Sequence, residues 1–394
     1  YFSQTSTFAG NISNLIDSNT TISQIATTSV GTSPVSVFVS GRYAYVANWN
    51  GGGAGSISVV DISNPSIPVQ IATTSVGAGA YSIYVSGRYA YTANYSGNNI
   101  SVVDISNPKA PIQIATAALG GVANPTSIYV SGRYAYVVNQ SLDSISVVDI
   151  SNPSAPIPIA TTSMGVGALP WSIYVSGRYA YVTNFGPDTI SVVDISNPST
   201  PILIATTSVG TNPIGIYVSG RYAYTTNNAS PYTISVVDIS NPSAPITVGT
   251  ASVGQSPNAI YVSGRYAYVV NQDFNTISVV DISSSTAPIQ VTSTAVGVSP
   301  RSIYVSGRYA YTANHDSNSI SVIDISGTEV TSLIAHSAEV GNLQSRNDIF
   351  AQGNIMAGTS LMVGAGGIMS NGALSVFASS TGATSSIFDI SSAQ

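Results

Sequence analysis

The amino-acid sequence predicts an all-β protein: a seven-bladed β-propeller of four-stranded blades, with β-rich N- and C-terminal extensions. The string Ser-Gly-Arg-Tyr-Ala-Tyr occurs seven times, with 43 to 46 residues between successive arginines. The string Ile-Ser-Val-Val-Asp-Ile-Ser, or a near copy, follows each occurrence. Strand-forming Val, Ile, Tyr and Thr dominate every repeat, and no helical period is sustained. Repeats of this length are typical of propeller blades.

One repeat illustrates the four strands expected in each blade. The first strand covers Ser82–Val85, and the Ser-Gly pair after it supplies the positive φ that a two-residue hairpin turn needs. The second strand covers Tyr89–Ala93, and a loop of variable length follows. The third covers Ile100–Ile105, and an Asn-Pro turn leads to the fourth, Ile112–Thr116.

Eight segments resemble the fourth strand, although seven blades need only seven. One copy, Ile22–Gly31, precedes the first blade, and another, at 330–341, follows the last. The N-terminal copy matches internal ones almost letter for letter, and pairing the two ends of the ring removes an open edge. We therefore expect the N-terminal copy to complete the seventh blade, with 330–341 as the alternative. The propeller then spans 22–327, between an N-terminal arm at 1–21 and a Gly-rich extension at 328–394.

Two strings resemble known repeats. Tyr179–Asn184 (Tyr-Ala-Tyr-Val-Thr-Asn) followed by Thr189–Ile195 resembles the YVTN-type β-propeller repeat, and Val-Asp-Ile-Ser-Asn-Pro resembles the LVIVD repeat. The likeness covers roughly residues 22 to 327 and recurs in every blade. Related families are common in prokaryotic surface proteins, which implies an extracellular or cell-surface location. Similar propellers also occur in redox enzymes and lyases, so the fold alone does not decide function.

Composition excludes several functions. Charged residues make up 7% of the chain, against about 25% in an average protein. The net charge of −6 argues against nucleic acid as a partner. The chain has no cysteine and no run of about 18 apolar residues, which excludes disulfides and a spanning helix. Six Asn-x-Ser/Thr sequons permit glycosylation at Asn11, Asn19, Asn94, Asn99, Asn139 and Asn228.

The repeat frame carries one arginine and one aspartate per blade, and we expect each blade to pair its own two as bidentate structural contacts. The alternative is a charged ring that binds a ligand. The pairs are Arg42 and Asp61, Arg88 and Asp104, Arg133 and Asp149, Arg178 and Asp194, Arg221 and Asp238, Arg265 and Asp281, and Arg308 and Asp324.

The variable loops on the opposite face hold the candidate ligand-binding residues Trp49, Trp171, Phe185, Phe274 and His315. Aromatic and Asn/Asp side chains there would stack on and hydrogen-bond a sugar. The alternative is ordinary loop filling.

Catalytic signals are weak. The adjacent His315 and Asp316 are more typical of a turn than of a metal site, and loop residues such as Asp143 and Asp188 lack EF-hand spacing for Ca²⁺. No phosphate-binding or dinucleotide fingerprint is present. We therefore expect no enzyme activity, no cofactor and no metal. The rival prediction is a hydrolase or lyase that uses acids around the channel.

The short, apolar, strand-like ends suggest assembly. Such segments fold when they find a partner strand, and a head-to-tail contact generates rings or filaments. We therefore predict an extracellular structural subunit that forms a surface filament or layer with copies of itself. The alternative is a monomeric adhesin that binds surface glycans or proteins through the variable loops.

Overall fold

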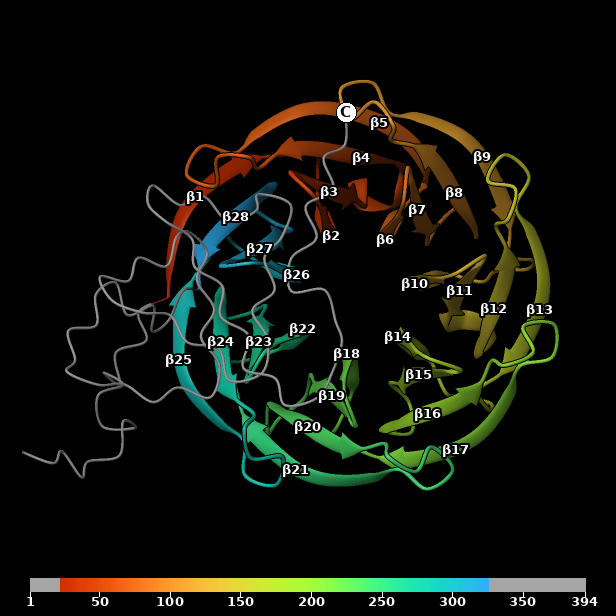
Figure 1. Ribbon diagram of the computed structural model, residues 1–394, viewed down its shortest axis with the longest axis vertical. Coiled ribbons are helices and arrows are strands. Elements are labelled where there is room, and N and C mark those ends of the chain that lie inside the picture. The colour runs from red at the N-terminus through yellow and green to blue at the C-terminus, as the bar shows by residue number, and fades with distance from the viewer. Residues whose placement is uncertain (1–21, 326–394) are drawn as a thin grey trace, which may run out of the picture. The chain divides into compact units, whose positions relative to one another are not determined.

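A computed structural model describes residues 22–325 as seven four-stranded antiparallel sheets arranged in a ring (Figure 1). Residues from all seven sheets line a central channel. This confirms the predicted all-β, seven-bladed propeller. The terminal segments predicted at 1–21 and 328–394 lie outside the described residues, and so does the segment at 330–341.

Each blade runs from an inner strand at the channel to an outer strand at the rim. The inner strands are β2 (Pro34–Ser40), β6 (Ala80–Ser86), β10 (Pro125–Ser131), β14 (Pro170–Ser176), β18 (Pro213–Ser219), β22 (Pro257–Ser263) and β26 (Pro300–Ser306). The second strands are β3 (Tyr43–Asn48), β7 (Tyr89–Asn94), β11 (Tyr134–Asn139), β15 (Tyr179–Asn184), β19 (Tyr222–Asn227), β23 (Tyr266–Asn271) and β27 (Tyr309–Asn314). The third strands are β4 (Ala54–Asp61), β8 (Asn99–Asp104), β12 (Ser144–Asp149), β16 (Thr189–Asp194), β20 (Thr233–Asp238), β24 (Thr276–Asp281) and β28 (Ser319–Asp324). The outer strands are β5 (Val69–Ala78), β9 (Ile112–Ala118), β13 (Ile157–Ser163), β17 (Ile202–Ser208), β21 (Ile246–Ser252), β25 (Ile289–Ala295) and β1 (Ser23–Ser29). Two short 3₁₀ turns, η2 (Asn50–Gly52) and η3 (Gln140–Leu142), follow second strands.

The N-terminal strand closes the ring. Strand β1 pairs antiparallel with β28, from Ser23 opposite Asp324 to Ser29 opposite Ser319. The last blade therefore takes its outer strand from the start of the propeller, which confirms the predicted closure.

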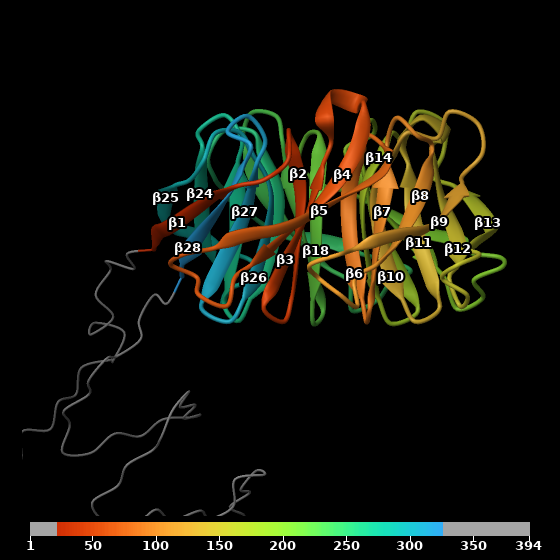
Figure 2. The ribbon, with the colours of Figure 1, turned by 90° about the horizontal axis from the view of Figure 1, so that it is seen from above.

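The two rims of the ring differ in their connections, as the edge-on view in Figure 2 shows. One rim, the turn face, carries the tight Ser-Gly turns and the Asn-Pro turns. Each of these seven glycines has a φ of +58° to +59°, a conformation that favours glycine. The other rim, the loop face, carries the variable loops, and the loop between β3 and β4 protrudes from it (Figure 2).

Apolar side chains pack between neighbouring blades. Ile100 and Val102 of one blade, for example, lie in one buried cluster with Ile128 and Val130 of the next. Each fully buried aliphatic side chain contributes about 1.5–3 kcal/mol to stability.

A buried asparagine ends the second strand of every blade. Its Nδ2 donates to a serine Oγ on the third strand, as from Asn184 to Ser191 at 2.8 Å. Its Oδ1 has a partner in only three blades, where a threonine two residues earlier donates to it, as Thr92 does to Asn94 at 2.9 Å. In the other four blades a valine stands there, and within residues 22–325 the Oδ1 atoms have no hydrogen-bond partner. These four residues are Asn48, Asn139, Asn184 and Asn271.

Candidate functional site at the mouth of the channel

Each inner strand contributes one residue to the channel mouth on the loop face. This residue follows the first residue of the strand, and no two blades share its type. The seven residues of this mouth layer are Val35, Tyr81, Thr126, Trp171, Ile214, Asn258 and Arg301. The mouth layer therefore breaks the sevenfold repetition of the chain.

A layer of small residues lies beneath the mouth layer. It consists of Ser36, Ser82, Ser127, Ser172, Gly215, Ala259 and Ser302. Four of the serines bridge neighbouring blades: the Ile83 N–H donates to Ser36 Oγ at 3.3 Å, for instance, and the Val37 N–H to Ser302 Oγ at 3.2 Å. These bonds hold the inner strands, and with them the mouth layer, in position.

An aromatic belt lies two residues further along the inner strands than the layer of small residues. Neighbouring ring centroids are 4.7 to 5.0 Å apart all the way round. The belt consists of Phe38, Tyr84, Tyr129, Tyr174, Tyr217, Tyr261 and Tyr304. Burial, with the neighbouring tyrosines, raises the pKa of Tyr129 and Tyr217. These hydroxyls therefore stay neutral at physiological pH.

Three loop residues complete the site above the mouth layer: Trp49, Tyr95 and His315, which follow second strands. The Trp49 and His315 rings lie 6.0 Å apart, and Tyr95 lies 5.6 Å from Tyr81. We call the resulting hollow the channel-mouth pocket. Its cavity volume is about 210 Å³, less than that of most drug-sized sites, which suits a small ligand. Its lining is Val35, Trp49, Tyr81, Tyr95, Trp171, Arg301 and His315.

Three buried nitrogen atoms of the pocket residues lack hydrogen-bond partners within residues 22–325. They are Nε1 of Trp49, Nε of Arg301 and Nε2 of His315. Two of them are donors only, and the third donates or accepts according to its proton. Buried polar groups are normally hydrogen-bonded. Three unpartnered nitrogens on residues that line one hollow therefore indicate a site where a ligand or ordered water supplies the missing hydrogen bonds.

His315 and Asp316 interact directly. His315 Nδ1 lies 2.5 Å from Asp316 Oδ1, and this contact is the main cause that lowers the pKa of Asp316. The carboxylate favours the tautomer with its proton on Nδ1, which leaves a lone pair on Nε2.

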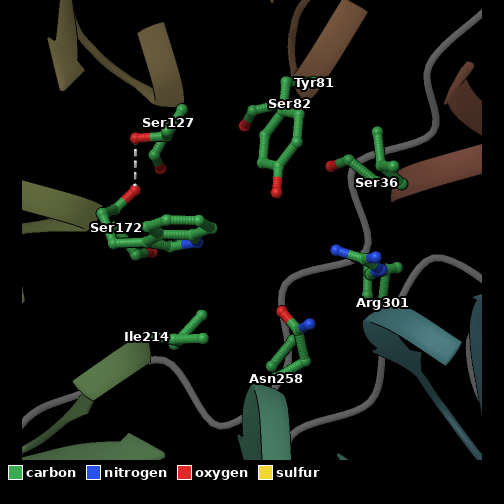
Figure 3. Close-up of a pocket in the computed structure, with 14 residues that line it drawn as sticks. Ser36, Tyr81, Ser82, Ser127, Ser172, Ile214, Asn258 and Arg301 are labelled. Atoms are coloured by element: carbon green, nitrogen blue, oxygen red, sulfur yellow. Dashed lines mark hydrogen bonds between the residues drawn. The ribbon is translucent and has the colours of Figure 1, made fainter. Parts of the chain in front are cut away.

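Arg301 makes no direct ion pair within residues 22–325, although its charge contributes to the lowered pKa of Asp316. In the described part of the chain no carboxylate lies within 4.0 Å of its guanidinium. Its nearby polar group is the hydroxyl of Tyr81, whose pKa burial raises although the charge of Arg301 opposes this shift. Tyr81 is therefore neutral and leaves the positive charge in place. Figure 3 shows the side chains of Tyr81, Asn258 and Arg301, from three blades, around the channel mouth.

The structure brings together three of the five residues predicted to bind a ligand: Trp49, Trp171 and His315 all line the pocket. Phe185 does not line it but packs on Trp171, with the ring centroids 5.9 Å apart. Phe274 lies outside the lining and is 58% exposed.

Sequence reasoning missed Tyr81, Tyr95 and Arg301 as site residues. A usable signal was present for Tyr81 and Arg301, because the position after the start of the inner strand is the one where all seven near-identical repeats differ. No comparable signal marks Tyr95.

The frame arginines and aspartates pair within each blade on the turn face. Arg133 Nη2, for example, lies 2.6 Å from Asp149 Oδ2, and its guanidinium lies over the ring of Tyr134. The other oxygen, Asp149 Oδ1, accepts the Ser151 N–H at 2.9 Å. The expected bidentate geometry is therefore wrong for six blades, because the turn takes the second oxygen. In the seventh, Arg308 Nε also reaches Asp324 Oδ1, at 3.4 Å.

Two of the predicted glycosylation sites are wrong. Asn94 and Asn139 are fully buried and donate to serine hydroxyls, so no glycan fits on them in the folded protein. Asn99 and Asn228 are half-buried, and their amides donate to backbone carbonyls at 3.0 and 3.2 Å. Glycosylation there stays a prediction, and Asn11 and Asn19 lie outside the described residues.

Within residues 22–325 no group of three or more His, Asp or Glu side chains could hold a metal ion. Asp143 and Asp188 instead accept backbone N–H groups of the neighbouring loops, at 2.7 to 2.8 Å. No helix found in that part of the chain is long and apolar enough to cross a membrane.

Comparison with known proteins identifies the repeat. The model of the LVIVD repeat matches seven segments: residues 33–74, 77–116, 122–161, 170–208, 214–252, 256–296 and 299–333. The chain belongs to the LVIVD repeat family. These segments follow the seven blades, as the resemblance of Val-Asp-Ile-Ser-Asn-Pro predicted. No curated protein matches the chain.

Solved propellers share the fold of this LVIVD repeat protein. One, from Bacteroides fragilis and described as a candidate 6-phosphogluconolactonase, is 18% identical, with a TM-score of 0.61 over 68% of this chain and 86% of its own. The periplasmic gluconolactonase of Pseudomonas aeruginosa is 19% identical, with a TM-score of 0.58 over 67% and 86%. Virginiamycin B lyase of Staphylococcus aureus is 11% identical, with a TM-score of 0.60 over 77% and 99%.

These neighbours contradict the prediction that the protein is not an enzyme. Three of the similar structures are described as gluconolactonases or candidate gluconolactonases. The prediction rested on the lack of a recognisable catalytic motif in the sequence, but the mouth layer is assembled from single residues of seven separate blades. At such low identity the likeness shows the fold alone, so the question of activity rests on the chain's own residues.

Proposed function

We propose that the protein binds a small carbohydrate-type ligand in the channel-mouth pocket. The observation that carries the proposal is the set of three buried, unpartnered nitrogens of Trp49, Arg301 and His315 around one hollow. Leaving a buried polar group unpaired costs about 1–3 kcal/mol, and a ligand oxygen offsets that cost.

The walls of the pocket suit the faces of a sugar ring. Trp49, Tyr81, Tyr95 and Trp171 line it, and Asn258 adds an amide to the mouth layer. Aromatic rings offer apolar faces, while the nitrogens and the amide offer hydrogen bonds to hydroxyls. Two similar propellers, one described as a candidate 6-phosphogluconolactonase and the other as a gluconolactonase, support a sugar-derived ligand.

Tryptophan fluorescence tests the proposal directly, because the chain has two tryptophans, Trp49 and Trp171, and both line the pocket. We expect the emission to change saturably with at least one member of a panel of monosaccharides and sugar acids. Trp49→Phe keeps a ring but removes the Nε1 donor, and should weaken binding measured by calorimetry roughly 2- to 10-fold.

Phe274→Leu is the matched control, because Phe274 is an exposed aromatic of the loop face outside the pocket lining. Its affinity should equal that of the wild type. The proposal fails if no sugar of the panel perturbs the fluorescence, or if Phe274→Leu weakens binding as much as Trp49→Phe.

A second candidate function is the hydrolytic opening of a sugar lactone, favoured by the contact of His315 with Asp316. His315 Nε2 would take a proton from water, whose oxygen then bonds to the lactone carbonyl carbon. Arg301 and Trp49 would donate to the carbonyl oxygen as it becomes negative. The ring C–O bond then breaks, and its oxygen takes the proton back from His315.

The test is the hydrolysis of D-glucono-1,5-lactone, followed in a pH-stat against the spontaneous rate. His315→Gln should lower the catalysed rate about 100-fold or more, while Phe274→Leu should leave it unchanged. Equal rates with and without the wild-type protein would exclude this activity for the lactone.

Assembly into a surface filament or layer, and location at the cell surface, stay predictions. The segments that would make the contacts lie outside residues 22–325. Electron microscopy of the native protein tests the assembly: filaments or sheets would support it, and isolated rings would contradict it.

A further inference from the structure

We propose that the ligand of the channel-mouth pocket is a sugar acid whose carboxylate binds the guanidinium of Arg301. This inference rests on the proposed carbohydrate site and adds the charge of its ligand.

Arg301 is unlike the arginines of the repeat. The seven frame arginines each pair with an aspartate of their own blade on the turn face. Arg301 lies on the loop face, in the mouth layer, and no carboxylate of the described residues lies within 4.0 Å of it. The other described arginines each have a directly paired aspartate, and Arg301 does not.

The other groups of the pocket do not neutralise Arg301. Tyr81 beside it is neutral, because burial raises its pKa. Asp316 contacts His315 directly and interacts with the charge of Arg301 only from beyond 4.0 Å, and its side chain is 55% exposed to solvent. Val35, Trp49 and Trp171 have no ionisable side chain. The described lining therefore presents one positive charge together with one unpartnered donor, Trp49 Nε1, while the unpartnered Nε2 of His315 carries a lone pair.

A carboxylate fits these donors better than a neutral hydroxyl does. A planar carboxylate accepts two parallel hydrogen bonds from a guanidinium, and the Nε–H is one of the donors that can make them. In Arg301 this Nε has no hydrogen-bond partner within residues 22–325. A hydroxyl of the same sugar would accept a hydrogen bond from Trp49 Nε1, and the sugar ring would stack beside Trp171. Aldonic and uronic acids combine both parts in one small molecule.

The test compares D-glucuronate with D-glucose, since the two share a ring and differ in the carboxylate. Calorimetric titration of the full chain should give glucuronate roughly 10- to 100-fold tighter binding, and this preference should shrink as NaCl is raised. Arg301→Gln should reduce glucuronate affinity to the level of glucose. Arg301→Lys should recover part of the preference, because it restores the charge without the planar fork.

Arg221→Gln is the control variant, because it removes the same charge from the turn face, where Arg221 pairs with Asp238. It should bind glucuronate like the wild type, and circular dichroism should show all variants folded. Equal affinity of wild type for glucose and glucuronate would overturn the carboxylate inference and leave the sugar site standing. An Arg301→Gln variant that loses both sugars equally would also overturn it. Failure of wild type to bind any sugar would refute the proposed function itself.

Discussion

Replacing Val46 by Thr should stabilise the protein, although burying a hydroxyl in place of a methyl group usually destabilises one. The second strand of the first blade reads Tyr-Ala-Tyr-Val-Ala-Asn and that of the second blade Tyr-Ala-Tyr-Thr-Ala-Asn. In the second blade Thr92 Oγ1 donates to Asn94 Oδ1 at 2.9 Å. In the first, within residues 22–325, Asn48 Oδ1 is buried without a partner. The substitution gives the first blade the strand of the second, and with it the missing donor.

The magnitude follows from the two sides of the exchange. Losing one buried methyl group costs about 0.8 kcal/mol. Pairing the orphan acceptor removes a penalty of about 1–3 kcal/mol. We expect a net gain of about 0.5–1 kcal/mol at Val46. The same change at Val46, Val137, Val182 and Val269 together should give about 2–4 kcal/mol, because the four sites lie in separate blades and add.

Guanidinium unfolding followed by circular dichroism measures these differences. Val103→Thr is the control. Val103 is fully buried in the second blade, and no described side chain of that blade has an unpartnered acceptor atom. The new hydroxyl therefore gains no partner, and the variant should lose about 1–3 kcal/mol of stability. Thr92→Val should also destabilise, because it orphans Asn94 Oδ1. The reasoning is refuted if Val46→Thr loses as much stability as Val103→Thr, or if Thr92→Val costs nothing.

Three further predictions concern the blades. Arg133 and Arg178 hold the pKa of Asp149 and Asp194 to about 2, below the value of about 4 expected in the unfolded chain. Since the pKa in the folded state is the lower one, stability should be constant above about pH 5 and fall as the pH drops from about 4 to 2. In acid unfolding curves, Arg133→Gln should lose less stability over this pH range than the wild type does. Gly254→Ala should lose about 1–3 kcal/mol in denaturant unfolding, because its Cβ would lie 2.6 Å from Asn271 Cγ; a wild-type midpoint would show that the asparagine moves aside. Expressed in a glycosylating host, the folded protein should carry no glycan at Asn94 or Asn139 by peptide mass mapping, and occupancy at either would contradict their burial.

Repetition made the fold predictable, because seven copies of one pattern specify the strands, the turns and the number of blades. The closing strand was predictable too, since Ile22–Gly31 repeats the internal outer strands and leaves no open edge. Strand boundaries were off by one or two residues: the inner strand expected at Ser82–Val85 spans Ala80–Ser86, and the third strand expected at Ile100–Ile105 spans Asn99–Asp104.

The site was only partly predictable. Trp49, Trp171 and His315 stand out in the sequence because rare residues interrupt a repeat. Tyr81 and Arg301, 220 positions apart in the chain, meet only because the ring closes and brings the second and seventh blades to one channel mouth. Asn94 and Asn139 show the opposite error: each forms a sequon locally, but strand pairing buries it. The burial of a side chain depends on which side of its strand faces a neighbouring blade.

The most direct test of the account is a crystal structure of the protein soaked with D-glucuronate. We predict the sugar in the channel-mouth pocket, with its carboxylate on the Arg301 guanidinium and its ring beside Trp49 and Trp171. The account would be contradicted by a pocket that stays empty at saturating glucuronate. It would also be contradicted by a sugar bound to the frame arginines of the turn face instead.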